Sequence, residues 1–202
     1  ITFAEQTGLI CDFDLAMCEK VVNWLDKGGR KGRHYMVAVN LSGSSIGSPR
    51  FVDALHDLLQ KKNSLRHRIL FEITESARIT DLEAVNRSVQ SLRDAGHKIC
   101  LDDFGAGAAA FQYLRALDID VVKIDGGYVR NALSTDKGTA FLKAMAGMCK
   151  DLGIVTVAEW VEDEQCLSFL RECGVDYGQG YLFGAPSSDI TMFEAPHPNL
   201  FN

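Results

Sequence analysis

The chain lacks a long hydrophobic run, and we expect no secretory leader. No apolar stretch among its 202 residues approaches the roughly 20 residues that a membrane-spanning helix needs. It opens at Ile1 without a charged leader, so we expect a cytoplasmic domain, either alone or as the cytoplasmic part of a larger membrane-associated protein, without membrane contact of its own. A composition of 47% hydrophobic and 24% charged residues is typical of globular proteins. This length suffices for one buried core, and we expect a single domain over residues 1–202.

Paired cysteines of the C-x-x-C type are also missing. The chain has six cysteines, and most stand within apolar runs, which is typical of reduced core residues in a reducing compartment. They are Cys11, Cys18, Cys100, Cys149, Cys166 and Cys173.

An excess of positive charge is absent too. The formal net charge is −6, and this argues against a surface that binds nucleic acid. A negatively charged site can still accept a phosphorylated ligand if divalent metal ions offset the repulsion. Metal ions would therefore matter for any phosphorylated substrate of this protein.

Segments with strand and helix patterns alternate along the chain, and we find no internal repeat or low-complexity segment. Strict alternation predicts a parallel sheet and an α/β fold, either an open doubly wound sheet or a barrel. The predicted strands are residues 35–39, 68–74, 98–101, 120–125, 154–158 and about 177–183. The predicted helices are residues 12–25, 49–60, 81–95, 109–116, 139–152 and 163–173.

Polar side chains stand at or near the carboxyl ends of successive predicted strands. In a barrel these ends meet at one mouth, whereas in an open six-stranded sheet the outer strands would lie too far apart to share a site. We therefore expect a modified (β/α)8, TIM-like barrel with six βα units in this chain and two strands upstream of Ile1. The polar residues are Asn40, Glu72, Asp102, Asp103, Lys123, Glu159 and Gln179.

Five of these positions supply one amide oxygen and four carboxylates, with neither histidine nor cysteine; they are Asn40, Glu72, Asp102, Asp103 and Glu159. Such a set of oxygen ligands suits Mg²⁺ or Mn²⁺ better than zinc, and a shared aspartate allows two ions. Two metals that activate a water molecule favour hydrolysis of a phosphodiester. Lys123 would then stabilise charge or orient the water, and Glu159 would serve as a ligand or a base.

Six short motifs recur in a characteristic order. They are Asn40–Ser42, Phe71–Ser76, Leu101–Gly105, Val122–Asp125, Ala158–Glu162 and Gln179–Tyr181. In order and spacing they resemble the EAL domain family of bacterial cyclic-di-GMP phosphodiesterases, from about Ile1 to Pro186. The resemblance implies a modified β/α barrel that hydrolyses cyclic di-GMP to linear pGpG with two Mg²⁺ or Mn²⁺ ions.

The resemblance also assigns roles to individual residues. It implies that the catalytic residues are Lys123, Glu159 and Asp103. The implied metal ligands are Asn40, Glu72, Asp102, Asp103 and Glu159. Residues that bind the substrate or support the site would be Glu75, Asp125, Glu162, Gln179 and Gly180. The implied partners are cyclic di-GMP, a second copy of the chain in a homodimer, and covalently linked upstream sensory or GGDEF-type domains.

The sequence departs from the family pattern at four places. The Glu-Ala-Leu segment is absent, and with it one metal ligand of the family. The loop of residues 105–110 is rich in alanine where the family has threonine, tyrosine and serine. Trp160 replaces a glycine, and Ala185 stands where a basic residue is common.

Three alternative functions stay open at this point. A domain of this family that has lost catalysis would be a cyclic-di-GMP receptor. An enolase-like enzyme, which removes a carbon-bound proton, also gathers carboxylates and lysines at a barrel mouth. Finally, residues 43–47 match the G-x-S-x-G nucleophile pattern, although neither His67 nor His97 has the context of a catalytic triad.

Overall fold

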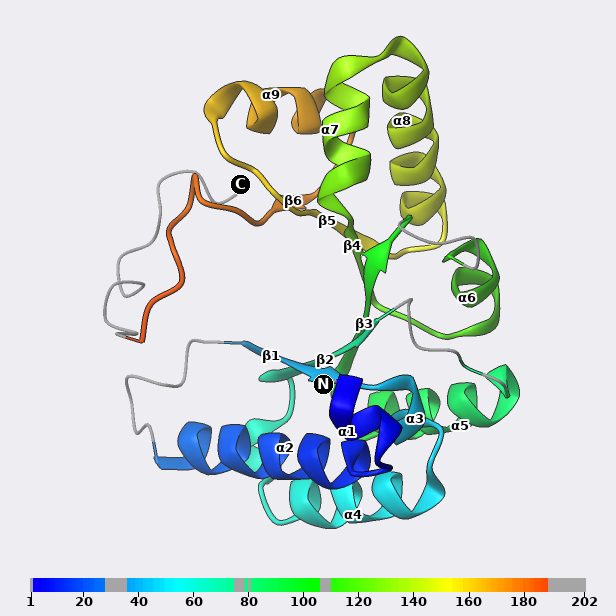
Figure 1. The fold of residues 1–202 in the computed structure, drawn as a ribbon, viewed down its shortest axis with the longest axis vertical. Coiled ribbons are helices and arrows are strands. Elements are labelled where there is room, and N and C mark those ends of the chain that lie inside the picture. The colour runs from blue at the N-terminus through cyan, green and yellow to red at the C-terminus, as the bar shows by residue number, and fades with distance from the viewer. Residues whose placement is uncertain (1, 28–35, 75–78, 80, 106–109, 189–202) are drawn as a thin grey trace. The chain divides into compact units, whose positions relative to one another are not determined.

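A computed structural model describes residues 2–27, 36–74, 79, 81–105 and 110–188 of the chain (Figure 1). The chain divides into two compact units. Unit 1 comprises residues 1–102 and 107–120, and unit 2 comprises residues 103–106 and 121–202. Glu75 and residues 106–109 of the alanine-rich loop lie outside the described residues, so the predictions made for them stay predictions.

The described residues form six strands that follow one another in chain order, from β1 to β6. In unit 1, β1 pairs in parallel with β2, and β2 with β3. In unit 2, β4 pairs in parallel with β5, and β5 with β6. This arrangement confirms the predicted parallel sheet of an α/β fold. The strands are β1 (Val37–Leu41), β2 (Ile69–Thr74), β3 (Lys98–Phe104), β4 (Val121–Ile124), β5 (Val155–Ala158) and β6 (Tyr177–Gly178).

The helices of unit 1 follow from amphipathic patterns and from good caps. In α4 (Pro49–Gln60), Phe51, Val52, Leu55 and Leu59 form a buried face, and α4 lies beside α2 (Figure 1). The hydroxyl of Ser48 caps α4. Pro49 follows at the first helical position, where proline is favoured. The other helices of the unit are α1 (Thr2–Gln6), α2 (Ile10–Lys27), α3 (Gly43–Ile46), α5 (Leu82–Asp94), α6 (Ala110–Ala116) and the 3₁₀ helix η2 (Asn63–Leu65).

Unit 2 contains one helix that the sequence analysis missed. Helix α7 (Gly126–Ser134) directly follows β4 and lies beside α8 (Asp136–Asp151), as Figure 1 shows. The two glycines at its start are typical of a turn, but the Asp125 carboxylate accepts the Gly127 amide at 2.9 Å and caps the helix. Thr135 separates the two helices, and α8 therefore begins three residues before the predicted helix. The last described helix is α9 (Glu164–Glu172).

The sixth strand is shorter than predicted. It ends at Gly178, and residues 181–183 form a turn. The reason is the close approach of Gly180 to the backbone of Val161, where a Cβ on residue 180 would lie 2.2 Å from the Val161 carbonyl oxygen. The Leu182 amide donates to that oxygen at 3.0 Å, which closes the turn. In contrast, β3 continues past the predicted end and includes Asp102 and Asp103.

All six cysteines are free thiols, and five of them are buried. Burial raises the pKa of Cys18 to about 12, with a further contribution from the Asp14 carboxylate. Burial likewise raises the pKa of Cys149 to about 11. The buried thiols are packed core groups, as the sequence indicated.

In the described part of the chain, no helix has the length and apolar character needed to cross a bilayer.

Candidate functional site

Three of the predicted ligands lie on one face of the sheet in unit 1. Asn40 is in register with Glu72, and Glu72 is in register with Cys100, two residues before Asp102. Aligned residues of parallel strands point to the same face, and so do residues two apart on one strand. Glu72 is 7% exposed and Asp102 is 9% exposed, so these two carboxylates are largely removed from solvent.

A buried aspartate that the sequence analysis did not select anchors the loop after Asn40. Asp14 of α2 is 5% exposed and accepts hydrogen bonds from the Ser42 amide at 2.8 Å and the Ser45 hydroxyl at 2.7 Å. A signal for it was present, because Asp14 stands among Ile10 and Cys18 on the apolar face of its helix. A carboxylate in such a stripe needs buried donors.

The same contacts decide the nature of the G-x-S-x-G pattern. Ser45 is 0% exposed, and its hydroxyl donates to Asp14 and accepts from Ser42. The Ser42 hydroxyl also accepts the Ser45 amide and caps α3. The pattern therefore forms a helix cap inside unit 1, and the interpretation as a serine nucleophile is wrong.

In unit 2, a lysine and a glutamate form an ion pair at the ends of neighbouring strands. The Lys123 ammonium lies 2.8 Å from Oε1 of Glu159, and only 9% and 16% of the two side chains are exposed. Lys123 is in register with Val157, two residues before Glu159. The Glu159 amide donates to the Ile124 carbonyl at 3.1 Å, which fixes the backbone where β5 ends. Partial burial strengthens this attraction relative to an exposed pair.

A second carboxylate lies close to Glu159. Carboxylate oxygens of Asp103 and Glu159 approach within 4.8 Å of each other. The backbone of Asp103 is left-handed, with φ at 56°, a conformation that is uncommon outside glycine and recurs at functional sites. Two carboxylates at this separation repel each other unless a cation lies between or beside them. Their oxygen donors, without histidine or cysteine, fit Mg²⁺ or Mn²⁺.

A pocket of about 390 Å³ opens beside Glu159. Its wall includes three further predicted residues, Glu162, Gln179 and Gly180. The backbone amide of Gln179 donates to the Ala158 carbonyl at 2.8 Å. The backbone carbonyl of Gln179 accepts from the Val161 amide at 3.0 Å. The structure thus brings these predicted residues together with Glu159 within unit 2. The remaining residues of the wall are Trp160, Tyr181, Gly184, Ala185 and Pro186.

Asp125, predicted to support the site, has a different visible task. Its carboxylate caps α7, and its amide donates to the Phe104 carbonyl at 3.2 Å. Lys123 pairs with Glu159 rather than with this neighbouring aspartate. Asp125 therefore links the end of β3 to the start of α7.

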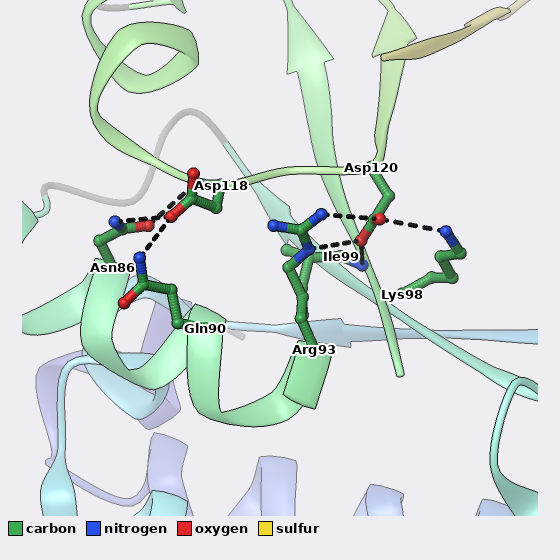
Figure 2. Close-up of polar contacts among 7 residues, drawn as sticks. All are labelled: Asn86, Gln90, Arg93, Lys98, Ile99, Asp118 and Asp120. Atoms are coloured by element: carbon green, nitrogen blue, oxygen red, sulfur yellow. Dashed lines mark hydrogen bonds and ion pairs between the residues drawn. The ribbon is translucent and has the colours of Figure 1, made fainter. Parts of the chain in front are cut away.

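A larger pocket, of about 590 Å³, lies in unit 1 near the amino ends of β3 and β4. Its acidic groups are already bonded (Figure 2). Asp120 accepts hydrogen bonds from the Ile99 amide at 3.0 Å, Lys98 at 3.1 Å and Arg93 at 3.2 Å. Burial opposes its ionisation, but these donors outweigh burial and lower the pKa of Asp120.

Asp118 is held in the same way in this pocket. It accepts hydrogen bonds from Gln90 at 2.6 Å and Asn86 at 3.0 Å, and these donors lower its pKa (Figure 2). Both aspartates thus tie α5 to the connection that enters β4. We assign this pocket a structural role.

An α/β chain with parallel strands, carboxylates near strand ends and a buried lysine paired with one of them has an arrangement typical of β/α-barrel enzymes. The EAL domain family matches residues 1–186, and the chain belongs to this family of phosphodiesterases. Its fold is therefore the TIM-barrel-like α/β fold of that family, as the sequence predicted.

Solved structures and curated relatives agree with this assignment. The crystal structure of an EAL domain protein from Listeria monocytogenes is 32% identical, with a TM-score of 0.77, over 92% of this chain and 72% of that one. The PaMucR phosphodiesterase in complex with c-di-GMP is 30% identical, with a TM-score of 0.78, over 95% of this chain and 78% of that one.

Cyclic di-GMP phosphodiesterase PdeB of Shewanella oneidensis is 34% identical over 186 residues. These residues are 92% of this chain and 22% of PdeB, so the chain spans about a fifth of that relative. The family assignment gives no support to the enolase-like alternative.

Proposed function

We propose that the protein hydrolyses cyclic di-GMP to linear pGpG with the help of Mg²⁺ or Mn²⁺. The observation that carries this proposal is the partly buried ion pair of Lys123 and Glu159, with the Asp103 carboxylate within 4.8 Å of Glu159, in a chain of a phosphodiesterase family. PdeB is named a cyclic di-GMP phosphodiesterase, and the PaMucR phosphodiesterase structure is a complex with c-di-GMP. Both names support this substrate over other phosphodiesters.

Asp103 and Glu159 are the residues of unit 2 that would hold a divalent cation. Such an ion supplies positive charge to the phosphodiester and lowers the pKa of water. The predicted second ion and the further ligands Asn40, Glu72 and Asp102 stay part of the proposal. Glu72 and Asp102 support it because they are buried acidic groups near the ends of their strands.

The chain's own groups have separate tasks in the reaction. A water oxygen forms a new bond to phosphorus, the bond from phosphorus to the 3′ oxygen breaks, and that oxygen leaves with a proton, which gives pGpG. Lys123 offers a fixed positive charge where negative charge grows on the phosphoryl oxygens. Its ion pair also holds the Glu159 carboxylate in one orientation, so that Glu159 can bind a cation or accept the proton of the water.

The test is to incubate the purified protein with cyclic di-GMP and separate the products by chromatography. We expect pGpG in Mg²⁺ or Mn²⁺ and none in EDTA. Glu159→Gln and Lys123→Met should each lower kcat by about 100-fold or more, because each removes one charge from the site. The matched controls Glu172→Gln and Lys150→Met change exposed residues of α9 and α8 and should keep the original rate.

Two results would contradict the enzyme assignment. If the protein binds cyclic di-GMP without turnover in either metal, it is a receptor. If it neither binds nor hydrolyses this dinucleotide, the proposed substrate is wrong. The predicted homodimer and the linked upstream domains stay predictions, which sedimentation and the full-length sequence can check.

A further inference from the structure

Trp160 presents a large aromatic side chain to the pocket beside Glu159. Its exposed fraction is 55%, and it lines the same 390 Å³ pocket as Glu159 and Gln179. The backbone of Trp160 is left-handed, with φ at 60°, a conformation that side chains with a Cβ rarely adopt. A bulky residue in this conformation is strained, and such strain is often found at ligand-binding positions.

One side of the indole packs against the first turn of α7. A Cβ on Gly126 would lie 2.0 Å from Cδ1 and 2.3 Å from Cγ of Trp160, so the ring lies directly on the backbone there. The guanidinium of Arg130 lies 4.6 Å from the centroid of the indole. Gly126 and Arg130 are four residues apart and share one face of the helix. Together they hold the indole in a fixed orientation.

Trp160 remains 55% exposed although the start of α7 packs against its ring. It lines a pocket whose wall combines carboxylates with Tyr181 and Pro186. A flat aromatic face beside a phosphodiester-cleaving site suits a nucleobase, since every base can stack on a tryptophan.

We propose that Trp160 is a substrate-binding residue that stacks on a purine base of the bound cyclic dinucleotide. This inference rests on the proposed function, because the base belongs to the substrate of that site. Arg130 is a positioning residue, which acts on the substrate through the orientation of the indole. Stacking would orient the nucleotide so that its phosphodiester lies against Glu159.

The test compares binding of cyclic di-GMP and cyclic di-UMP by calorimetry, with Ca²⁺ in place of Mg²⁺ because Ca²⁺ takes the same oxygen ligands. Trp160→Ala should weaken cyclic di-GMP binding by about 5- to 150-fold, the range for loss of one stacked base. Trp160→Phe should restore most of the affinity. Trp160→Gly, which relieves the backbone strain, should lose as much affinity as Trp160→Ala. The smaller pyrimidine ring should make the loss for cyclic di-UMP several-fold lower.

The two tryptophans of the chain provide a direct optical readout. In a Trp24→Phe protein the remaining fluorescence comes from Trp160, and cyclic di-GMP should quench it within the mixing time of a stopped-flow experiment. Trp24 lies on α2 in unit 1, and Trp24→Ala should leave the affinity unchanged.

The outcomes separate this inference from the proposed function. If the original protein binds cyclic di-GMP and Trp160→Ala binds it equally well, stacking is wrong and the function stands. Equal losses for the purine and pyrimidine dinucleotides would also overturn stacking, because the residue would then act through the loop backbone. If the original protein binds neither dinucleotide, the proposed function is wrong and the stacking role falls with it.

Discussion

Gly126 and Trp160 fit together because residue 126 has no side chain. A Cβ at that position would lie 2.0 Å from Cδ1 of the indole. The contact joins the start of α7 to the residue that follows Glu159. Trp160 can therefore occupy its place in the pocket wall only if residue 126 is glycine.

The first prediction concerns this pair. Gly126→Ala should lower the free energy of unfolding by about 1–3 kcal/mol, because overpacking forces the indole or the helix to move. Trp160→Gly should remove that penalty in the double variant, and urea unfolding of all four proteins measures the coupling.

Gly147 is the matched control for this experiment. It lies in α8, and a Cβ there would meet nothing within 4 Å. Gly147→Ala should therefore raise the stability by up to about 1 kcal/mol. Equal effects of the two glycine substitutions would contradict the packing argument.

The second prediction concerns the pH dependence of stability. His97 is 5% exposed, and its pKa is lowered from 6.5 to about 4, first by burial and then by the nearby positive charges of His56, His67 and Arg66. The folded state therefore binds fewer protons on His97 than the unfolded state between pH 6.5 and 4. Stability should be full above pH 6.5 and should fall with pH across this window, by up to about 1.4 kcal/mol per pH unit.

A His97→Phe protein tests the assignment of this pH dependence. Phenylalanine keeps the edge-to-face contact with Phe71, whose ring centroid lies 5.6 Å away, and it cannot be protonated. Urea midpoints between pH 7 and pH 4.5 should lose the slope that His97 contributes. His67→Asn keeps the local backbone, whose φ is 63°, but removes one of the positive charges near His97. It should therefore narrow the pH window without abolishing the slope. An unchanged slope in His97→Phe would assign the effect to other groups.

The third prediction concerns the buried carboxylate of Asp14. Asp14→Ala should destabilise the protein by about 1–3 kcal/mol, because it leaves the Ser42 amide and the Ser45 hydroxyl without their buried acceptor. Thermal unfolding measures the change. Asp12→Ala, on the exposed side of the same helix, should have an effect within about 0.5 kcal/mol. Hydrogen exchange of the Ser42 amide should increase in Asp14→Ala alone if this bond anchors the loop.

Local patterns were sufficient for most elements of the fold. The apolar spacing and the proline at position 49 predicted α4 with the bounds that the structure has. Helix α7 was not predicted because an aspartate followed by two glycines is equally typical of a turn. Formation of the helix depends on its packing against α8. The end of β6 depends on the approach of Gly180 to Val161, a contact between segments far apart in sequence.

For the candidate site too, the sequence predicted where the residues stand but not which of them pair. The placement of Lys123, Asp103 and Glu159 at or near the carboxyl ends of their strands follows from alternation alone, because parallel strands end at the same edge of a sheet. Pairing of Lys123 with Glu159, rather than with Asp125, follows from the register of β4 and β5. Periodicity does not set that register.

For Trp160, the sequence by itself determined that an indole stands next to Glu159, and nothing about its orientation. Tertiary structure decided that orientation, because Gly126 leaves room for the ring and Arg130 lies over it. The sequence likewise determined an α/β chain with oxygen ligands near its strand ends, since alternation and residue chemistry are local properties. Which of these groups touch depends on contacts between distant segments, and those contacts exist only in the folded protein.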